Sequence, residues 1–400
     1  MGFDGGSGFV PGKQGGPTPP PPAGDVMVGN TLFVSSLGDD ATAFPNDLTH
    51  HYATIDAAIA ALTSNYDVIH VYGGLYSVNS TAMPSGVNTL NIFTPNNATR
   101  VEFFETIFGM VNLNITGEGN IIIQPQQNDL ATANITASFL QCNYLLFNGG
   151  SFYFQISKLL ACQFYMTDLP LFMRVVANRM EGNFIAINPE NIDVEVICNE
   201  FTGLTFINDF NTGNWKINIK ANRIFYENSS PTAYLFSYTG INSALNKYIL
   251  ECPDIYWKSD TPLIRQQGGT FAFANCNFKH EFSGSVNAPV FSVADYLDSG
   301  NPVWLYLRNC DIIILNNDCS KGVIHAYNSP GLNIYIMIDG VNVFSNTKIN
   351  YIIDYDDPGE YFGILGSADE NVFTDWANAN ATNAAGLPNV QLISGMPNFN

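Results

Sequence analysis

A weak internal repeat constrains the fold of this chain more than any other feature. From about residue 110 to residue 345, a run of alternating apolar residues is followed by a small residue, an Asn or Cys, a polar residue and another apolar residue. The Asn or Cys position is held by Cys142, Cys162, Asn178, Asn199, Asn222, Pro253, Cys276, Cys310 and Val341. The intervals are 20, 16, 21, 23, 31, 23, 34 and 31 residues. Such a repeat indicates a β-solenoid, in which short strands stack coil upon coil.

The repeat register predicts which side chains lie inside the solenoid. The position before the Asn or Cys is mostly small and holds Gln141, Ala161, Ala177, Cys198, Ala221, Cys252, Asn275, Asn309 and Gly340. The position two residues after it is bulky and apolar, and it holds Met180, Phe201, Ile224, Ile255, Phe278, Ile312 and Val343. We expect this bulky column to stack in the interior. We also expect the Asn and Cys residues to be buried at a tight corner, paired along the stack as in amide ladders.

A third column is predicted to face outward. It holds Arg179, Glu200, Arg223, Asp254, Asn277, Asp311 and Asn342. Successive coils lie about 4.8 Å apart, and like charges directly opposite each other are destabilising. The alternation of cations and anions therefore supports the register and has a structural interpretation, although each exposed pair contributes only ~0–1 kcal/mol.

Residues 26–78 predict a cassette that caps the first coil. Thr31 to Ser35 reads as a strand, Thr54 is a plausible N-cap, and Val68 to Tyr72 reads as a second strand. Between them, apolar residues at helical spacing predict a helix of about two turns. These residues are Ile55, Ala58, Ile59 and Leu62. A short amphipathic helix at this point would cover the otherwise open end of the solenoid.

The cassette resembles the N-terminal part of pectin-lyase-like right-handed parallel β-helix proteins, which include polysaccharide lyases, glycosidases and phage tailspike and fibre proteins. The resemblance lies in Phe33-Val34, Gly38-Asp39-Asp40, Tyr52 to Ile59 and Val68 to Tyr76, with Gly73-Gly74 in place of the usual Pro-Gly. It implies an all-β, right-handed single-stranded parallel β-helix over residues 79–358. Because homotrimers are frequent among the phage relatives, it also implies a homo-oligomer, with a trimer favoured. It implies no particular activity.

The two ends of the chain differ in composition from the repeat. Residues 1–25 are rich in Gly and Pro and cannot bury enough surface to order themselves. We expect this segment to be an arm that anchors the protein to other virion proteins. The anchoring residues predicted are Phe3, Phe9, Val10, Pro19, Pro20, Pro21 and Pro22. Residues 359–400 are expected to form a C-terminal cap or an oligomer contact.

Charge and composition exclude several classes of partner. The formal net charge is −20, with only 15 Lys and Arg residues, so the clustered cations that nucleic-acid binding requires are not expected. Residues 1–25 lack the apolar core of a signal peptide, and no run of about 18 apolar residues predicts a membrane span. The chain is therefore expected to be made in a host cytoplasm and to reside in a virion. Seven cysteines without a Cys-x-x-Cys pair are expected to be buried free thiols.

The function predicted from these features is that of a non-enzymatic virion structural protein, a phage fibre, spike or decoration subunit. Its exposed aromatic residues could bind host-surface carbohydrate. The alternative is a polysaccharide lyase or glycoside hydrolase on the same fold, and a cell-surface adhesin is a third possibility. The candidate catalytic carboxylates of the enzyme alternative are Asp254, Asp311, Asp354, Asp356 and Asp357. The spacing of the His and Cys residues predicts no metal or cofactor site.

Overall fold

The computed structural model describes residues 29–394 with gaps at 80, 125–126, 143–144, 168–170, 188–190, 203–205, 209–213, 228–234, 239–246, 267–268, 283–287, 294–302, 317–322, 327–333, 346–352, 356–361 and 367–389. The predicted arm of residues 1–25 and most of the predicted cap of residues 359–400 lie outside the described residues. So do Asp356 and Asp357.

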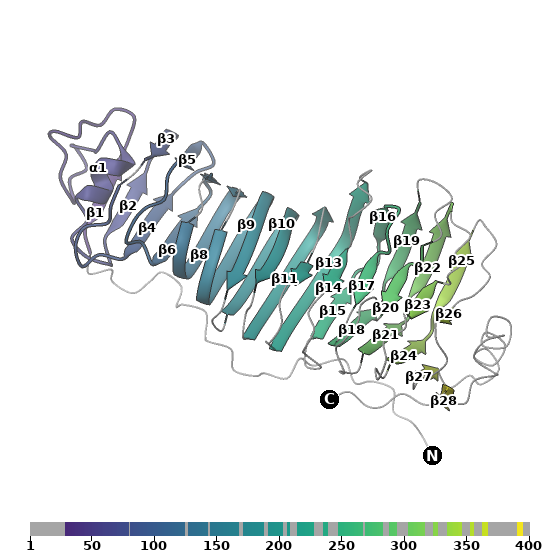
Figure 1. Ribbon diagram of the computed structural model, residues 1–400. Helices are drawn as coiled ribbons and strands as arrows, with labels where there is room; N and C mark the ends of the chain where they lie inside the picture. The colour runs from purple at the N-terminus through teal and green to yellow at the C-terminus, as the bar shows by residue number, and fades with distance from the viewer. Residues whose placement is uncertain are drawn as a thin grey trace, which may run out of the picture.

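The described strands wind into an elongated parallel β-helix, as predicted (Figure 1). Every strand pair in the described residues is parallel, and each strand pairs with the equivalent strand of the next coil. The long strands turn corners, so that one strand contributes to two or three sheets; these strands are β8 (Gln127–Cys142), β9 (Leu145–Thr167), β10 (Leu171–Ile187), β11 (Asn191–Thr202) and β13 (Asn214–Glu227). The stacked coils therefore build three sheets around one apolar interior.

The remaining strands belong to one sheet each. The first sheet adds β1 (Thr31–Val34), β2 (Val68–Val71), β4 (Thr89–Thr94), β6 (Asn112–Gly117), β15 (Lys247–Glu251), β18 (Gly269–Ala274), β21 (Val303–Arg308), β24 (Ile334–Asp339), β27 (Phe362–Gly366) and β28 (Val390–Ser394). The second sheet adds β3 (Gly74–Val78), β5 (Thr99–Phe103), β7 (Asn120–Ile123), β16 (Ile255–Lys258), β19 (Asn277–Glu281), β22 (Asp311–Leu315) and β25 (Asn342–Ser345). The third adds β12 (Phe206–Asn208), β14 (Phe236–Tyr238), β17 (Ile264–Gln266), β20 (Phe291–Val293), β23 (Ile324–Ala326) and β26 (Ile353–Tyr355).

The predicted inner column is confirmed from residue 180 onward. Met180 pairs with Phe201, Phe201 with Ile224, and the same register continues through the remaining members of the column. The side chains of its members from Met180 to Ile312 are buried. The outward column is confirmed by the same pairings, because Arg179 lies beside Glu200 and Asp311 beside Asn342. Alternation of apolar and polar residues therefore identified the correct faces.

Two early members of the predicted repeat were wrong. Met180 pairs with Leu159, so the corner residue of that coil is Ser157, and Cys162 instead pairs with Gly182. Cys142 pairs with Ile123 on the second sheet and does not lie at the corner. A cysteine side chain is small enough to fit several positions of a coil, and this explains why the pattern also matched Cys142, which is buried away from the corner. Cys142 is also disulfide-bonded and is not a free thiol, whereas the thiols of Cys198, Cys252, Cys276 and Cys310 are free and buried as predicted.

The corner between the first and second sheets has two forms. In the central coils, two consecutive residues face outward, so Asn178, Asn199 and Asn222 are exposed and the prediction that they are buried was wrong. In the later coils the corner uses left-handed backbone, with φ of 55° at Asn275, 50° at Asn309 and 61° at Gly340. Asn and Gly tolerate this conformation better than other residues do. The turn therefore selects Asn or Gly at this position, while the Cys276 and Cys310 side chains that follow Asn275 and Asn309 fill the interior.

A short helix covers the N-terminal end of the stack, as the apolar spacing predicted (Figure 1). Helix α1 spans Ile55–Ala60, and the Thr54 hydroxyl caps it by accepting a 3.1 Å hydrogen bond from the Ala57 amide. Asp40 holds the capping residue in turn, because its carboxylate accepts hydrogen bonds from the Thr54 amide and hydroxyl. The side chains of Ile55, Ala58 and Ile59 are buried against the first coil.

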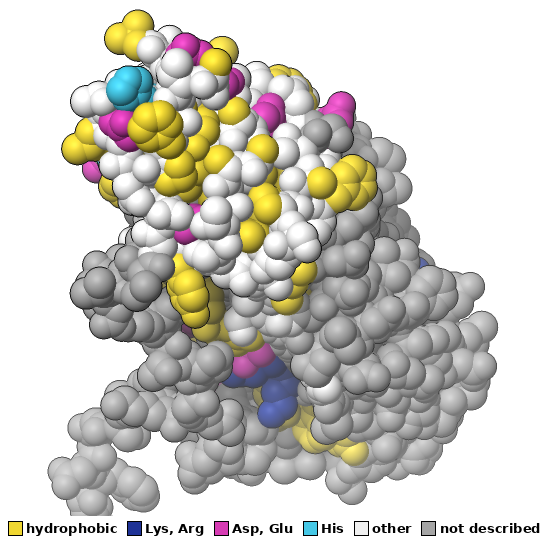
Figure 2. All heavy atoms as spheres, turned by 90° about the vertical axis from the view of Figure 1, so that its left-hand side faces the viewer, with side chains coloured by type: hydrophobic (Ala, Val, Ile, Leu, Met, Phe, Trp, Pro, Cys, Tyr) yellow, Lys and Arg dark blue, Asp and Glu magenta, His cyan; other side chains and the backbone are white. Residues whose placement is uncertain are grey.

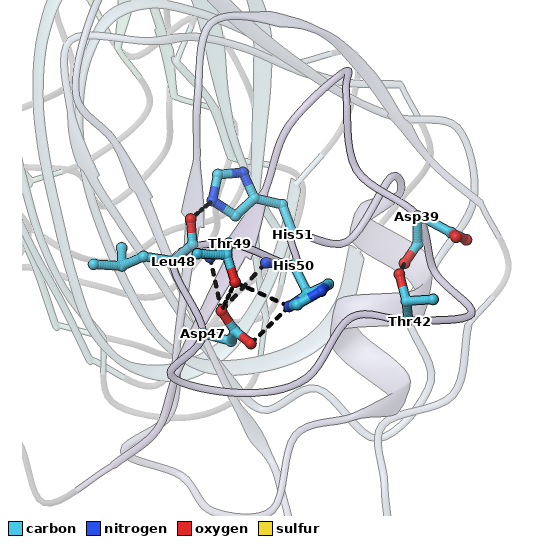
Figure 3. Close-up of polar contacts among 7 residues, drawn as sticks. All are labelled: Asp39, Thr42, Asp47, Leu48, Thr49, His50 and His51. Atoms are coloured by element: carbon cyan, nitrogen blue, oxygen red, sulfur yellow. Dashed lines mark hydrogen bonds and ion pairs between the residues drawn. The ribbon is translucent and has the colours of Figure 1, made fainter.

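The loop between β1 and α1 is fixed by its own polar groups (Figure 3). The Asp47 carboxylate accepts hydrogen bonds from the Thr49 amide at 2.7 Å and the Thr49 hydroxyl at 2.6 Å. It also lies 2.9 Å from Nδ1 of His50. The hydrogen bonds from Thr49, followed by that from His50, hold the pKa of Asp47 well below its usual range. The carboxylate therefore remains charged and keeps the loop in one conformation.

The N-terminal end also carries exposed apolar side chains (Figure 2). All the large hydrophobic residues that are exposed in the described part of the chain lie between residues 37 and 108. They are Leu37, Phe44, Leu48, Tyr66, Leu75, Phe93, Phe104 and Phe108. Among the described residues, the structure contains no helix long and apolar enough to cross a membrane.

Candidate functional site

The candidate carboxylates of the enzyme alternative are only partly brought together. Asp254 and Asp311 lie two coils apart in the outward column of the second sheet, as predicted, with Asn277 between them. Asp354 lies on β26 in the third sheet, where it pairs with His325. The three described candidates therefore do not form one cluster, while Asp356 and Asp357 lie outside the described residues. Asp254 is moreover ion-paired, since its Oδ2 lies 3.3 Å from Nε of Arg223.

Beside this column, the second sheet presents aromatic rings on its outer surface. Phe225 of β13 stacks on Tyr256 of β16, with ring centroids 5.1 Å apart and planes inclined by 15°. The Arg223 guanidinium lies 5.2 Å from the centroid of Phe225, and Nζ of Lys279 lies 5.3 Å from that of Tyr256. Both rings are half-buried and so offer part of their surface to solvent. Such cation–ring contacts also hold the rings in place.

Three charged residues border the rings on the same face. Glu227, Lys258 and Glu281 occupy consecutive coils in one column. Nζ of Lys258 lies 3.0 Å from Oε1 of Glu227 and 3.8 Å from Oε1 of Glu281. The Tyr256 hydroxyl donates a 2.8 Å hydrogen bond to Oε2 of Glu281.

We call this surface the aromatic face. It comprises Arg223, Phe225, Glu227, Asp254, Tyr256, Lys258, Lys279 and Glu281. Its polar groups are held in fixed positions around two rings, because most of them are bonded to one another.

The proton affinities on the aromatic face follow from these contacts. Burial is the largest cause that raises the pKa of Tyr256 to about 12, and the hydrogen bond to Glu281 and the charges of Glu281 and Glu227 add to it. The hydrogen bond to Glu227 and the charges of both glutamates raise the pKa of Lys258. At neutral pH, Tyr256 is therefore a hydrogen-bond donor and Lys258 is a cation.

Positive charge is concentrated in the coils around this face. Ten of the 15 Lys and Arg residues lie between residues 158 and 281, together with 12 acidic residues. The pairs formed there join neighbouring coils, for example Arg174 to Glu195 at 3.1 Å and Lys220 to Glu251 at 3.1 Å. The central coils are thus close to neutral.

The geometry suits binding better than glycoside cleavage. A glycosidase needs one carboxyl that keeps its proton, which requires an apolar surrounding or a neighbouring anion. Asp254, Glu227 and Glu281 instead each form an ion pair, Asp254 with Arg223 and the two glutamates with Lys258. In the described residues, no group of three His, Cys, Asp or Glu side chains lies close enough to hold a metal ion. Rings flanked by fixed donors and acceptors, by contrast, match the apolar faces and hydroxyl groups of sugars.

The sequence prediction missed most of the aromatic face. It identified Arg223 and Asp254 as members of the outward column but did not extend the register along the strands. Two residues further on, the same register gives Phe225, Tyr256 and Lys279. Four residues further on, it gives Glu227, Lys258 and Glu281. The alternation of aromatic and charged residues in these columns was therefore present in the sequence.

Comparisons with known proteins add no further information on the function. No family model matches the chain, and neither a curated protein nor a solved structure matches it. The resemblance to pectin-lyase-like proteins thus depends on the cassette residues quoted above and stays a prediction.

Proposed function

We propose that this protein is a non-enzymatic structural β-helix of a virion, and that it binds host-surface glycans through the aromatic face. The observation that carries the binding proposal is the stacked pair Phe225 and Tyr256 with its border of fixed charges. Stacking on a sugar ring buries apolar surface on both sides. Because the polar side chains are already ordered by their ion pairs, binding a sugar costs little additional side-chain entropy.

Two features support the structural part of the proposal. The β-helix is a rod whose coils stack only on their neighbours, which gives a stiff element for display. The Gly- and Pro-rich composition of residues 1–25 is that of a segment that becomes ordered on a partner. A trimeric assembly remains part of the proposal, as implied by the resemblance to phage fibre proteins.

The binding proposal is tested by screening the protein on an array of bacterial surface glycans. We expect Phe225→Ala and Tyr256→Ala each to lower the affinity for the bound glycan about ten-fold or more, since each removes a stacking surface. Tyr153→Ala is the matched control, because Tyr153 also packs against an aromatic partner, Phe172, on a different sheet. Unchanged binding by both variants, or equal loss in the control, would show that the face is not the site.

The virion proposal is tested separately during infection. Full-length protein and a truncated form lacking residues 1–25 are expressed with different tags, and the particles are purified. We expect only the full-length form to sediment with the particles, while the truncated form folds normally as judged by circular dichroism. Equal incorporation of both forms would contradict the role of the arm.

Glycan cleavage remains the second candidate function, because Asp254 and Asp311 are separated by two coils in one column. Two coil steps correspond to roughly 10 Å, near the upper end of the range for an inverting glycosidase. Release of reducing ends from bound glycans, lost in Asp254→Asn and in Asp311→Asn, would establish this activity in place of simple binding.

A further inference from the structure

A furrow runs along the helix axis beside the aromatic face, at the corner between the first and second sheets. It has a volume of about 590 Å³, which lies within the range of ligand sites in proteins. One wall is the corner column with Ser157, Asn178, Asn199 and Asn222, and the floor is backbone above the buried side chains of Ile156, Ala177 and Cys198. The opposite wall is the neighbouring outward column of the first sheet.

The corner wall is an ordered ladder of amides. The Asn222 side chain donates a 2.7 Å hydrogen bond to Oδ1 of Asn199, and Asn199 donates a 2.7 Å hydrogen bond to Oδ1 of Asn178. Each bond uses one of the two N–H groups and one lone pair of an amide, so every member keeps a donor and an acceptor for a ligand. All the amides point the same way. The wall therefore presents a repeated and directional set of hydrogen-bonding groups whose rotamers are already fixed.

The opposite wall is apolar at its centre. Val176 and Ile197 lie side by side in the register and are half-buried, with Gln155 before them and Lys220 after them. Lys220 is the last residue of this column. Its positive charge is neutralised by an ion pair with Glu251 at 3.1 Å. Two consecutive coils thus offer an amide on one side and an aliphatic side chain on the other, Asn178 with Val176 and Asn199 with Ile197.

These walls select among classes of ligand. A peptide that binds as an added strand needs a free sheet edge, but the strands here are paired on both sides. A polyanion would need uncompensated cations, and the one lysine lining the furrow is paired. An unbranched neutral glycan meets both walls, because its hydroxyl groups can bond to the amides while its C–H surfaces pack on Val176 and Ile197.

We propose that the furrow binds an extended, uncharged oligosaccharide along the helix axis, with successive sugars on successive coils. The register from Thr136 to Lys220 comprises four coil steps of about 4.8 Å, or roughly 19 Å in total. The proposal rests on the proposed function in that both require glycan binding. It adds a second site, the class of ligand and the direction in which the ligand lies.

The test measures the affinity of the full-length protein for cello-, xylo-, chito- and laminari-oligosaccharides of two to eight units by calorimetry. For the series that binds, affinity rises with each added unit until the chain has about four units, the length of the furrow, and then stays constant. Asn199→Ala lowers the affinity for the four-unit chain about ten-fold, since it removes ligand contacts and breaks the ladder.

Two further variants keep the test independent of folding effects. Ser157→Trp fills the furrow from an exposed position and leaves all three Asn residues in place, and it abolishes the dependence on chain length. Asn218→Ala is the matched control, because Asn218 lies in the same coil as Asn222 on the outer side of the first sheet but outside the furrow. This control binds all chain lengths with wild-type affinity.

The possible failures separate the two sites. The furrow is excluded as a site if wild-type affinity is independent of chain length, or if Ser157→Trp and Asn199→Ala bind as the wild type does. It is also excluded if none of the four series binds. In each of these cases the proposed function stands if Tyr256→Ala still lowers the affinity for the glycan bound on the array. If no glycan on the array is bound, the proposed function and the furrow are both excluded.

Discussion

Single residues on the inner face of the second sheet decide whether the coils can stack. The inward column of bulky apolar residues is buried along the central and later coils, and Ile224, for example, pairs in register with Phe201 of one neighbouring coil and Ile255 of the other. An adjacent inward column contains Trp257 and His280, which are also buried. A polar substitution should therefore lower the free energy of unfolding far more at these positions than at the outward residues beside them.

Ile224→Asp tests the inner column directly. The side chain of Ile224 is 0% exposed, so the substitution places an unpaired carboxylate in the apolar interior. We expect the free energy of unfolding to fall by at least about 4 kcal/mol, or the variant to fail to fold. Chemical denaturation followed by circular dichroism measures this. Asn218→Asp is the control, because the same carboxylate then lies on the outer side of the coil, and an equally stable Ile224→Asp variant would contradict the register.

His280 makes stability depend on pH. Its ring is buried, it stacks on Phe282 with centroids 3.9 Å apart, and Nε2 donates a 3.1 Å hydrogen bond to the carbonyl oxygen of Ser259. Burial lowers the pKa of His280 from 6.5 to about 4, and the smaller effects of the Ser259 carbonyl and the Asp260 charge oppose it. The unfolded chain therefore binds a proton between these two pH values, whereas the folded protein does not.

The expected consequence is a loss of stability on acidification. The contribution of a neutral His280 is fully present above pH 6.5 and is lost as the pH falls toward 4, by about 3 kcal/mol in total. Because carboxylates also titrate in the lower part of this range, the measurement is the difference between wild type and His280→Leu in denaturant midpoint from pH 7.5 to 4. We expect the wild-type midpoint to fall relative to that of His280→Leu as the pH falls, and a constant difference would refute the assignment.

At the scale of elements, one buried carboxylate connects the strands and the helix of the N-terminal cassette. Asp67, just before β2, is 1% exposed. It accepts hydrogen bonds from the Asn30 amide next to β1 and from the amides and hydroxyls of Thr63 and Ser64 after α1. Burial alone would raise the pKa of Asp67, but these hydrogen bonds outweigh it and lower the pKa from 3.8 to about 2. One side chain thus connects β1, α1 and β2.

Asp67→Asn should loosen this connection. The charged form contributes about 2 kcal/mol of stability above pH 3.8, and this contribution is lost as the pH falls through 2. We expect the variant to unfold more easily by about that amount at pH 7 and to show less change than wild type between pH 4 and 2. Thermal unfolding monitored by circular dichroism measures both. Asp39→Asn, at an exposed position in the preceding loop, should have little effect.

The positions that could be predicted from the sequence are those whose side chains are buried between the coils above and below. Ile224 and its equivalents can only be large and apolar, so their column was found correctly. Cys142 and Cys162 were misplaced because a cysteine side chain is small enough for several positions along a coil. Asn178 was placed inside because its amide was expected to be bonded, but the ladder forms equally well outside. Tyr256 was missed because packing restricts the residue type little at outward positions. The members of an outward column can be identified only after the register of the inward residues is known.

At the scale of the whole molecule, stability is a sum over neighbouring coils. Each strand of the central coils pairs only with its equivalents above and below. Removing one complete coil should consequently remove one interface while leaving the remaining ones in register. Removing part of a coil should leave the following strands without equivalent strands to pair with and misalign the corners of the coil.

Deletion of residues 178–198 tests this property. Ala177 and Cys198 are register partners, so joining Ala177 to Asn199 removes one 21-residue coil. We expect a folded protein whose melting temperature is lower by only a few degrees. Deletion of residues 178–187, which removes about half a coil, is the control and should prevent folding. Equal damage from both deletions would mean that the coils are not interchangeable units.

The uneven distribution of charge along the chain affects whether two molecules can associate end to end. Outside the balanced middle, residues 1–157 contain 2 basic and 11 acidic residues, and residues 282–400 contain 3 and 12. Solenoids whose terminal strands lie open can polymerise tip to tip into filaments. Because both end portions of the sequence are net negative, we expect them to repel each other within a Debye length of about 10 Å in 0.1 M salt. At the N-terminal tip, α1 additionally covers the terminal strands. We therefore expect end-to-end growth of the rod to be disfavoured at low ionic strength.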